Sequence, residues 1–90
     1  MTRHPFLEVS YRKGKPFAGY LHLREPSAVR SCRTEELRPG VLLDIAPDGE
    51  AMGIEFLAAG KVRTEDLQAI RERFGEGQVA VADLAPIMAK

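Results

Sequence analysis

The sequence contains no tryptophan, one cysteine and no long apolar run. The single cysteine and the lack of a long apolar run each exclude a class of protein. A single cysteine cannot form an internal disulfide, so the chain is not a small secreted domain held by disulfides. The longest uncharged stretch, Pro16 to Leu23, has eight residues, whereas a membrane helix needs about 20. The first residues also lack the apolar segment of a signal peptide. We therefore expect a cytoplasmic protein that has no membrane contact.

Net charge is also absent, because 13 basic residues balance 13 acidic residues. The charges are nevertheless uneven along the chain: residues 1–34 carry seven basic and two acidic residues, and residues 35–60 carry one basic and six acidic residues. In a small sheet these segments are neighbours, and mutual neutralisation is the simplest interpretation. Because the isoelectric point is about 6.7, a nucleic-acid partner is not expected.

Residues suited to catalysis or metal binding are few and scattered. Cys32 is the only thiol, and His4 and His22 are the only imidazoles. A nucleophilic pair of Cys32 and His22 would need both side chains within hydrogen-bonding distance and a third group to orient them. Neither Cys-x-x-Cys nor His-x-x-x-His occurs, and the glycines do not have the spacing of a phosphate-binding loop. We expect no catalytic residue, no metal and no cofactor.

The clearest structural signal is the stretch from Val41 to Leu57, in which two apolar runs flank a turn sequence, Pro47-Asp48-Gly49. This pattern predicts a β-hairpin. A loop centred on Asp48 and Gly49 places three apolar pairs on one face: Ile45 with Met52, Leu43 with Ile54, and Val41 with Phe56. A three-residue loop would instead place Met52 opposite Asp44 and mix the two faces, so the sequence favours the even-numbered loop.

The segments before Val41 are predicted to be strands, and the segment after Leu57 is predicted to contain a helix. Alternation predicts a strand over 6–12, with Leu7, Val9 and Tyr11 on one face, and a strand over 17–24, with Phe17, Leu21 and Leu23 opposite Tyr20 and His22. A weaker, edge-like strand is expected over 29–34. A helix is expected over 65–74, capped by Thr64 and ended at Gly75, with a stripe of Leu67, Ile70 and Phe74. Residues 79–82 fit a short strand or a connector, and Asp83 could cap a last short helix.

This order predicts an α+β fold: an antiparallel β-meander of about four strands, in two hairpins, with a C-terminal helix packed on one face. Residues 1–90 form a single domain, with the sheet in 1–60 and a helical extension in 61–90. The apolar residues of the hairpin would meet the helix stripe. The other face of the sheet is not fully polar, so either the C-terminal tail or a second subunit is expected to cover it. Its apolar residues are expected to be Tyr20, Leu42, Ala46, Ala51 and Leu57.

The chain resembles the bacterial domain of unknown function 2283 family over residues of about 11–57. The motifs are Tyr11, the run from Ala18 to Leu23, Thr34-Glu35-Glu36, the run from Gly40 to Asp44, and Asp48-Gly49 followed by Gly53-Ile54-Glu55-Phe56-Leu57. Arg12 and Phe17 stand where the family usually has acidic residues, so any role of those acids does not carry over. The resemblance implies a small, mostly antiparallel sheet and no activity. Some relatives look like the partner half of toxin–antitoxin pairs.

Three functional hypotheses follow, of which the first is preferred. The chain is a non-enzymatic protein-interaction module that forms a homodimer. Alternatively, it is an antitoxin-like partner of a small toxin, which rests on the resemblance alone. The third hypothesis is a small ligand-binding or hydrolytic domain on the outer sheet face, where four residues are candidates: His22, Asp44, Gly53 and Glu55. Gly53 is included because a glycine inside a strand indicates a bulge, or a group that approaches the backbone closely.

Overall fold

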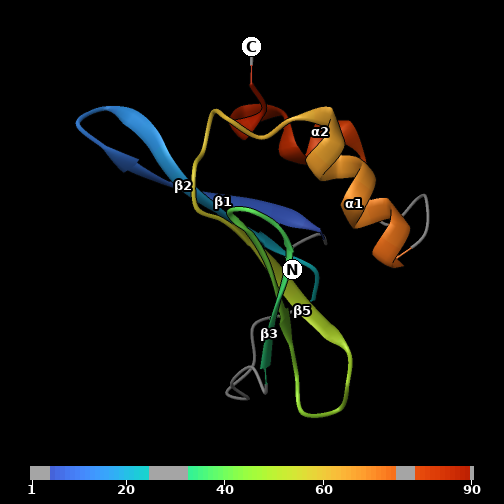
Figure 1. The fold of residues 1–90 in the computed structure, drawn as a ribbon. Coiled ribbons are helices and arrows are strands. Elements are labelled where there is room, and N and C mark those ends of the chain that lie inside the picture. The colour runs from blue at the N-terminus through green and yellow to red at the C-terminus, as the bar shows by residue number, and fades with distance from the viewer. Residues whose placement is uncertain (1–4, 25–32, 75–78, 90) are drawn as a thin grey trace.

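The computed structural model describes residues 5–24, 33–74 and 79–89, except for the side chain of Phe74, and shows a five-stranded sheet followed by helices (Figure 1). The α+β class is confirmed. The strands come first in the chain and the helices last, with these bounds: β1 Phe6–Arg12, β2 Lys15–His22, β3 Arg33–Arg38, β4 Val41–Ile45, β5 Ala51–Phe56, α1 Thr64–Phe74, α2 Val81–Leu84 and the short 3-10 helix η1 Ala85–Ile87.

The sheet is antiparallel in the order β1-β2-β5-β4-β3. The predictions of about four strands and of a simple meander were therefore wrong. After β2 the chain crosses to the far edge of the sheet to form β3, and β5 then returns to pair with β2. Such an order places residues around 20 beside residues around 55, which a meander would have kept apart.

The β4–β5 hairpin keeps most of the predicted register but reaches it differently. Val41 pairs with Phe56 and Leu43 with Ile54, as expected. The loop nevertheless has three residues, because Ala46 and Glu50 form the closing pair and Gly49 adopts a φ of +86°. Ile45 pairs with Ala51, so Met52 is an extra residue that bulges between two pairs.

This bulge compensates for the odd-numbered loop. A three-residue loop shifts the register by one residue, and the additional residue in β5 shifts it back, so the apolar faces stay matched. The predicted pairing of Ile45 with Met52 was wrong. Ala51, which was expected on the outer face, packs against the core instead.

The β1–β2 hairpin turns at Lys13 and Gly14, both with positive φ, and extends past the rest of the sheet (Figure 1). β5 pairs with β2 only from Gly19 onward, so no other strand in the described part of the chain lies beside the end of the hairpin. Tyr11 was predicted to share one face of the strand with Leu7 and Val9, but it is 65% exposed, and Phe17 is 48% exposed. Alternation gives a side chain a face, but it does not show whether anything lies on that face.

The weakly patterned strand expected over 29–34 is β3, Arg33–Arg38, and residues 29–32 lie outside the described part. This edge strand carries few apolar residues because its inward-facing position opposite Leu43 is Glu35. The Glu35 carboxylate is satisfied by Arg73 of α1, at 3.0 Å. β3 then reaches β4 through a turn at Pro39 and Gly40, where Gly40 has a positive φ.

α1 begins one residue earlier than predicted, so Thr64 is its first helical residue and not its cap. The Arg63 carbonyl accepts the first helical hydrogen bonds, and the Asp66 carboxylate accepts the Arg63 backbone N–H at 2.9 Å. Asp66 is buried and also accepts a hydrogen bond from Arg38 Nε at 2.8 Å. Two ion pairs, one at each end of α1, therefore join it to β3. No helix in the described part is long and apolar enough to cross a membrane.

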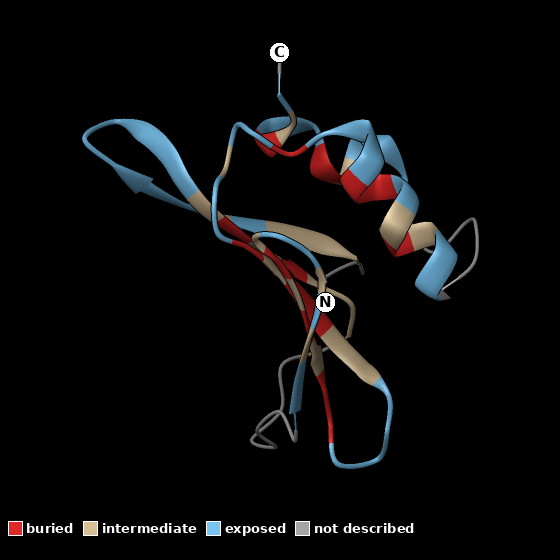
Figure 2. Ribbon diagram, in the orientation of Figure 1, coloured by how far each residue is buried: buried red, intermediate tan, exposed pale blue. Residues whose placement is uncertain are grey.

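The core lies between the sheet and the helical segment (Figure 2). Leu67 and Ile70 of α1, together with Leu84 and Ile87 of the tail, belong to one buried cluster with the inward-facing residues of β2, β4 and β5. A Cβ on Gly19 would lie 3.2 Å from Ile87, so this glycine lets the tail approach β2 closely. The tail thus packs on the same face as α1 and leaves the opposite face open.

The end of the chain is helical and irregular. Residues 79–82 form no strand; Val81 and Ala82 instead begin α2. Asp83 lies in the first turn of α2, where its carboxylate accepts the Ala80 backbone N–H at 2.8 Å. The tail is held to the segment before α1 by a parallel bridge between Val62 and Met88.

Candidate functional site

Among the described residues, no helix or strand packs on the side of the sheet that faces away from α1, and this surface consists of two adjacent rows of residues. Strand pairing aligns one residue from each strand in a row, and ten residues form what we call the outer face. In the order of the sheet, the first row is Phe6, His22, Gly53, Asp44 and Thr34, and the second is Glu8, Tyr20, Glu55, Leu42 and Glu36.

A hydrogen-bond network occupies one half of this face. The Tyr20 hydroxyl donates to Asp44 Oδ2 at 2.9 Å, and the Thr34 hydroxyl donates to Asp44 Oδ1, also at 2.9 Å. Asp44 thus uses one carboxylate oxygen for β2 and the other for β3, although it lies on β4. The network spans β5 without using a side chain from that strand.

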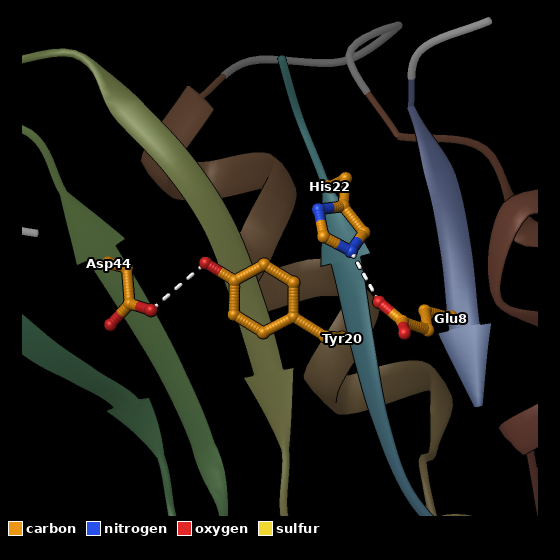
Figure 3. Close-up of polar contacts among 4 residues, drawn as sticks. All are labelled: Glu8, Tyr20, His22 and Asp44. Atoms are coloured by element: carbon orange, nitrogen blue, oxygen red, sulfur yellow. Dashed lines mark hydrogen bonds and ion pairs between the residues drawn. The ribbon is translucent and has the colours of Figure 1, made fainter. Parts of the chain in front are cut away.

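A second group of contacts occupies the other half. His22 Nε2 lies 2.9 Å from Glu8 Oε1 (Figure 3). The His22 ring stacks on Phe6, with ring centroids 4.4 Å apart and an angle of 10° between the ring planes. The Tyr20 ring also packs against the His22 ring, with the two ring centroids 4.8 Å apart. Three aromatic rings therefore form a continuous patch on β1 and β2.

Gly53 is present because Tyr20 covers it. A Cβ at this position would lie 2.6 Å from both Cζ and Oη of the Tyr20 ring, which is closer than real side chains approach each other. The close neighbour that an interior glycine indicates is therefore a side chain of the same molecule. With no side chain at Gly53, the phenol ring can cross β5 and reach Asp44 (Figure 3).

The structure brings three of the four predicted site residues into one row and divides their side chains between two networks. His22 and Asp44 both pair with Gly53, from opposite sides. The Tyr20 ring lies between their side chains, as Figure 3 shows, and each has its own partner. Glu55 lies in the neighbouring row, between Tyr20 and Leu42. Cys32 and His4 lie outside the described residues. Among the described residues, no three His, Cys, Asp or Glu side chains are arranged to hold a metal ion.

The electrostatics of the outer face are one-sided. Four of its ten residues are acidic, and none is lysine or arginine: the acids are Glu8, Glu36, Asp44 and Glu55. Burial raises the pKa of the Tyr20 phenol well above its usual 10, and the hydrogen bond to Asp44 and the nearby Asp44 and Glu55 charges raise it further. Tyr20 is therefore neutral at pH 7 and acts as a hydrogen-bond donor, not as a base.

A separate groove lies on the other side of the molecule, between β3 and α1. It has a volume of about 550 Å³ and is widely open, and Leu37, Thr64, Gln68 and Glu72 are among the residues that line it. None of the predicted site residues lines this groove.

The sequence did not indicate the partners that hold the predicted residues in place. Glu8 is the partner of His22, and Thr34 and Tyr20 donate hydrogen bonds to Asp44. Alternation did place Tyr20 and His22 on the same face, and the hairpin register did place Asp44 opposite Gly53. The missing information was the pairing of β2 with β5, which joins the two halves. No local sequence signal specifies this pairing.

A family model described as Protein of unknown function (DUF2283) matches residues 18–59, which confirms the resemblance to that family over β2 to β5. The matched segment includes all four predicted site residues, together with Tyr20 and Thr34. Phe6, Glu8 and the helices lie outside it. No curated protein and no solved structure matches the chain significantly.

Proposed function

We propose that this protein is a non-enzymatic protein-interaction module and that the outer face is the surface that contacts its partner. The proposal is carried by one observation: an open five-stranded sheet presents an aromatic patch beside four carboxylates, with no lysine or arginine on the same face. Aromatic side chains supply contact area at low entropic cost, and a surface of one charge sign selects a partner of the opposite sign.

The hydrogen bonding on this face supports binding over catalysis. The Tyr20 and Thr34 hydroxyls and His22 Nε2 already have partners within the protein, which supports a positioning role for these groups. What remains available to a partner is ring surface, the Leu42 side chain and the carboxylates of Glu36 and Glu55. These two carboxylates form no ion pair with another described residue.

The expected partner therefore carries a basic, partly apolar surface. A second copy of this chain is one such partner. No contact among the described residues favours an antitoxin-like role over other protein contacts, so the proposal names protein binding only.

Affinity capture with matched variants tests this proposal. Glu36→Lys/Glu55→Lys reverses one exposed and one half-buried charge on the outer face, and Glu72→Lys reverses one exposed charge on α1. We expect the partner retained by the wild type to be lost from the outer-face variant and kept by the α1 variant. Equal capture by all three proteins would show that the outer face is not the binding surface.

A further inference from the structure

The end of the β1–β2 hairpin is an isolated two-stranded ribbon. Every residue from 10 to 17 is exposed, and we call this segment the basic arm. The arm lies before Gly19, the first residue of β2 that pairs with β5, so no third described strand lies beside it. It projects from the body of the molecule (Figures 1 and 2). An isolated two-stranded ribbon is only marginally stable in water, so an ordered arm of this kind would gain stability from a surface that covers it.

The chemistry of the arm is the complement of that of the outer face. It carries three basic residues, Arg12, Lys13 and Lys15, and no acidic residue. It also exposes two large rings, Tyr11 and Phe17, and the Arg12 guanidinium lies 4.5 Å from the centroid of the Phe17 ring. The arm therefore presents positive charge and aromatic surface, whereas the outer face presents negative charge and aromatic surface.

We propose that the basic arm of one protomer lies on the outer face of a second copy of the chain, and that the second copy returns the same contact. This inference rests on the proposed function and names the partner. Both surfaces belong to one chain whose net charge is zero, so two copies supply both halves of each contact. A reciprocal exchange of this kind has the two-fold symmetry that is commonest among homo-oligomers.

The size of the two surfaces favours the reciprocal arrangement. A stable interface uses roughly 20–30 residues from each partner. The arm supplies eight residues and the outer face ten, so neither surface alone is large enough. When both are used at once, each protomer contributes a number close to the lower end of that range.

Charge-reversed variants test the proposal through a mixing experiment. Lys13→Glu/Lys15→Glu changes the net charge of the arm from +3 to −1, and Glu8→Lys added to Glu36→Lys/Glu55→Lys changes that of the outer face from −4 to +2. We expect the wild-type chain of 10.0 kDa to sediment as a dimer in low salt and the dimer to weaken as salt is added. Each variant alone should dimerise about a hundredfold more weakly, because like charges then face each other in both contacts.

An equimolar mixture of the two variants should restore the dimer. The acidic arm then meets the basic face, and the unchanged arm of the second variant meets the unchanged face of the first, so both contacts are complementary. Lys61→Glu is the control, because this exposed residue lies outside both surfaces; its dimer should match that of the wild type. Failure of the mixture to associate would overturn the proposal, as would a monomeric wild type.

Two further measurements separate the possible failures. If the wild type is monomeric but the outer-face variant loses its captured partner, the homodimer is wrong and the proposed function stands. If the outer-face variant also keeps that partner, both are wrong. A labelled DNA duplex tests nucleic acid as the other possible occupant of the basic arm. If a monomeric wild type bound the duplex and Lys13→Glu/Lys15→Glu abolished this binding, the arm would be assigned to nucleic acid instead.

Discussion

The ring of Tyr20 lies directly over Gly53, and this contact between β2 and β5 organises the outer face. It allows the phenol hydroxyl to reach Asp44 on the next strand. The glycine is therefore required by its neighbour and not by its own backbone conformation.

Gly53→Ala should destabilise the protein by about 1–3 kcal/mol, the usual cost of adding a methyl group to a filled site. The added Cβ forces the Tyr20 ring to move away from Asp44. In a Tyr20→Ala background the same change should be neutral or slightly stabilising, because alanine is preferred to glycine within a strand. Urea unfolding of the four proteins measures this coupling. An equal loss in both backgrounds would contradict the contact.

Asp44→Ala should cost more free energy of unfolding than the loss of its weaker partner, Thr34. The Tyr20 hydroxyl is then left half-buried without an acceptor, and an unsatisfied group of this kind costs about 1–3 kcal/mol. Thr34→Val, which removes only the bond at the exposed edge, should cost about 0.5–1.5 kcal/mol. If unfolding experiments ranked these two variants in the opposite order, Asp44 would not be the centre of the network.

Alkaline pH should destabilise the fold through Tyr20. The pKa of this phenol is raised in the folded state by burial and by Asp44. Its stabilising contribution is therefore complete below the unfolded pKa of about 10 and is lost as the pH rises above that value, because only the unfolded chain then releases the proton. Tyr20→Phe should make stability less dependent on pH between about 9 and 12. Chemical unfolding at several pH values measures the slope, and identical slopes would exclude this role.

The loss of Asp66 at the start of α1 should lower the free energy of unfolding more than the loss of the Glu35–Arg73 ion pair at its end. Asp66 is buried and accepts hydrogen bonds from both Arg38 and the Arg63 backbone. We expect Asp66→Ala to cost about 2–3 kcal/mol, since it removes a cap and leaves Arg38 without its carboxylate. Glu35→Gln, at the partly exposed pair, should cost less than about 1 kcal/mol. Thermal unfolding followed by circular dichroism compares them, and equal effects would contradict the difference in burial.

The fold follows from the sequence wherever a short segment carries its own signal. Alternation marks the inner faces of β2 and β4, and the spacing of Leu67 and Ile70 marks α1. β3 was placed too early because its inward position is Glu35, whose partner, Arg73, lies 38 residues further along the chain. The pairing of β2 with β5 is equally non-local. The outer face could therefore be predicted as two separate halves but not as one surface.

The register of the β4–β5 hairpin could be predicted, but the mechanism that sets it could not. A two-residue loop without a bulge and a three-residue loop with one bulge both pair Val41 with Phe56 and Leu43 with Ile54, so these apolar pairs do not distinguish them. The structure has the second arrangement, with Met52 as the extra residue. Deletions offer a direct test of it.

Deletion of Met52 should leave the fold intact, because it removes the bulge while Ile45 keeps Ala51 and Asp44 keeps Gly53 as partners. We expect a loss of about 1 kcal/mol from the backbone bond that Met52 accepts from Leu23. Deletion of Glu55 is the matched control: it moves Phe56 from the core to the outer face, which should cost at least about 2–3 kcal/mol. Unfolding curves and backbone amide spectra distinguish the two variants. If both deletions destabilise the protein equally, Met52 is not the extra residue in β5, and the two-residue loop without a bulge is the better description of this hairpin.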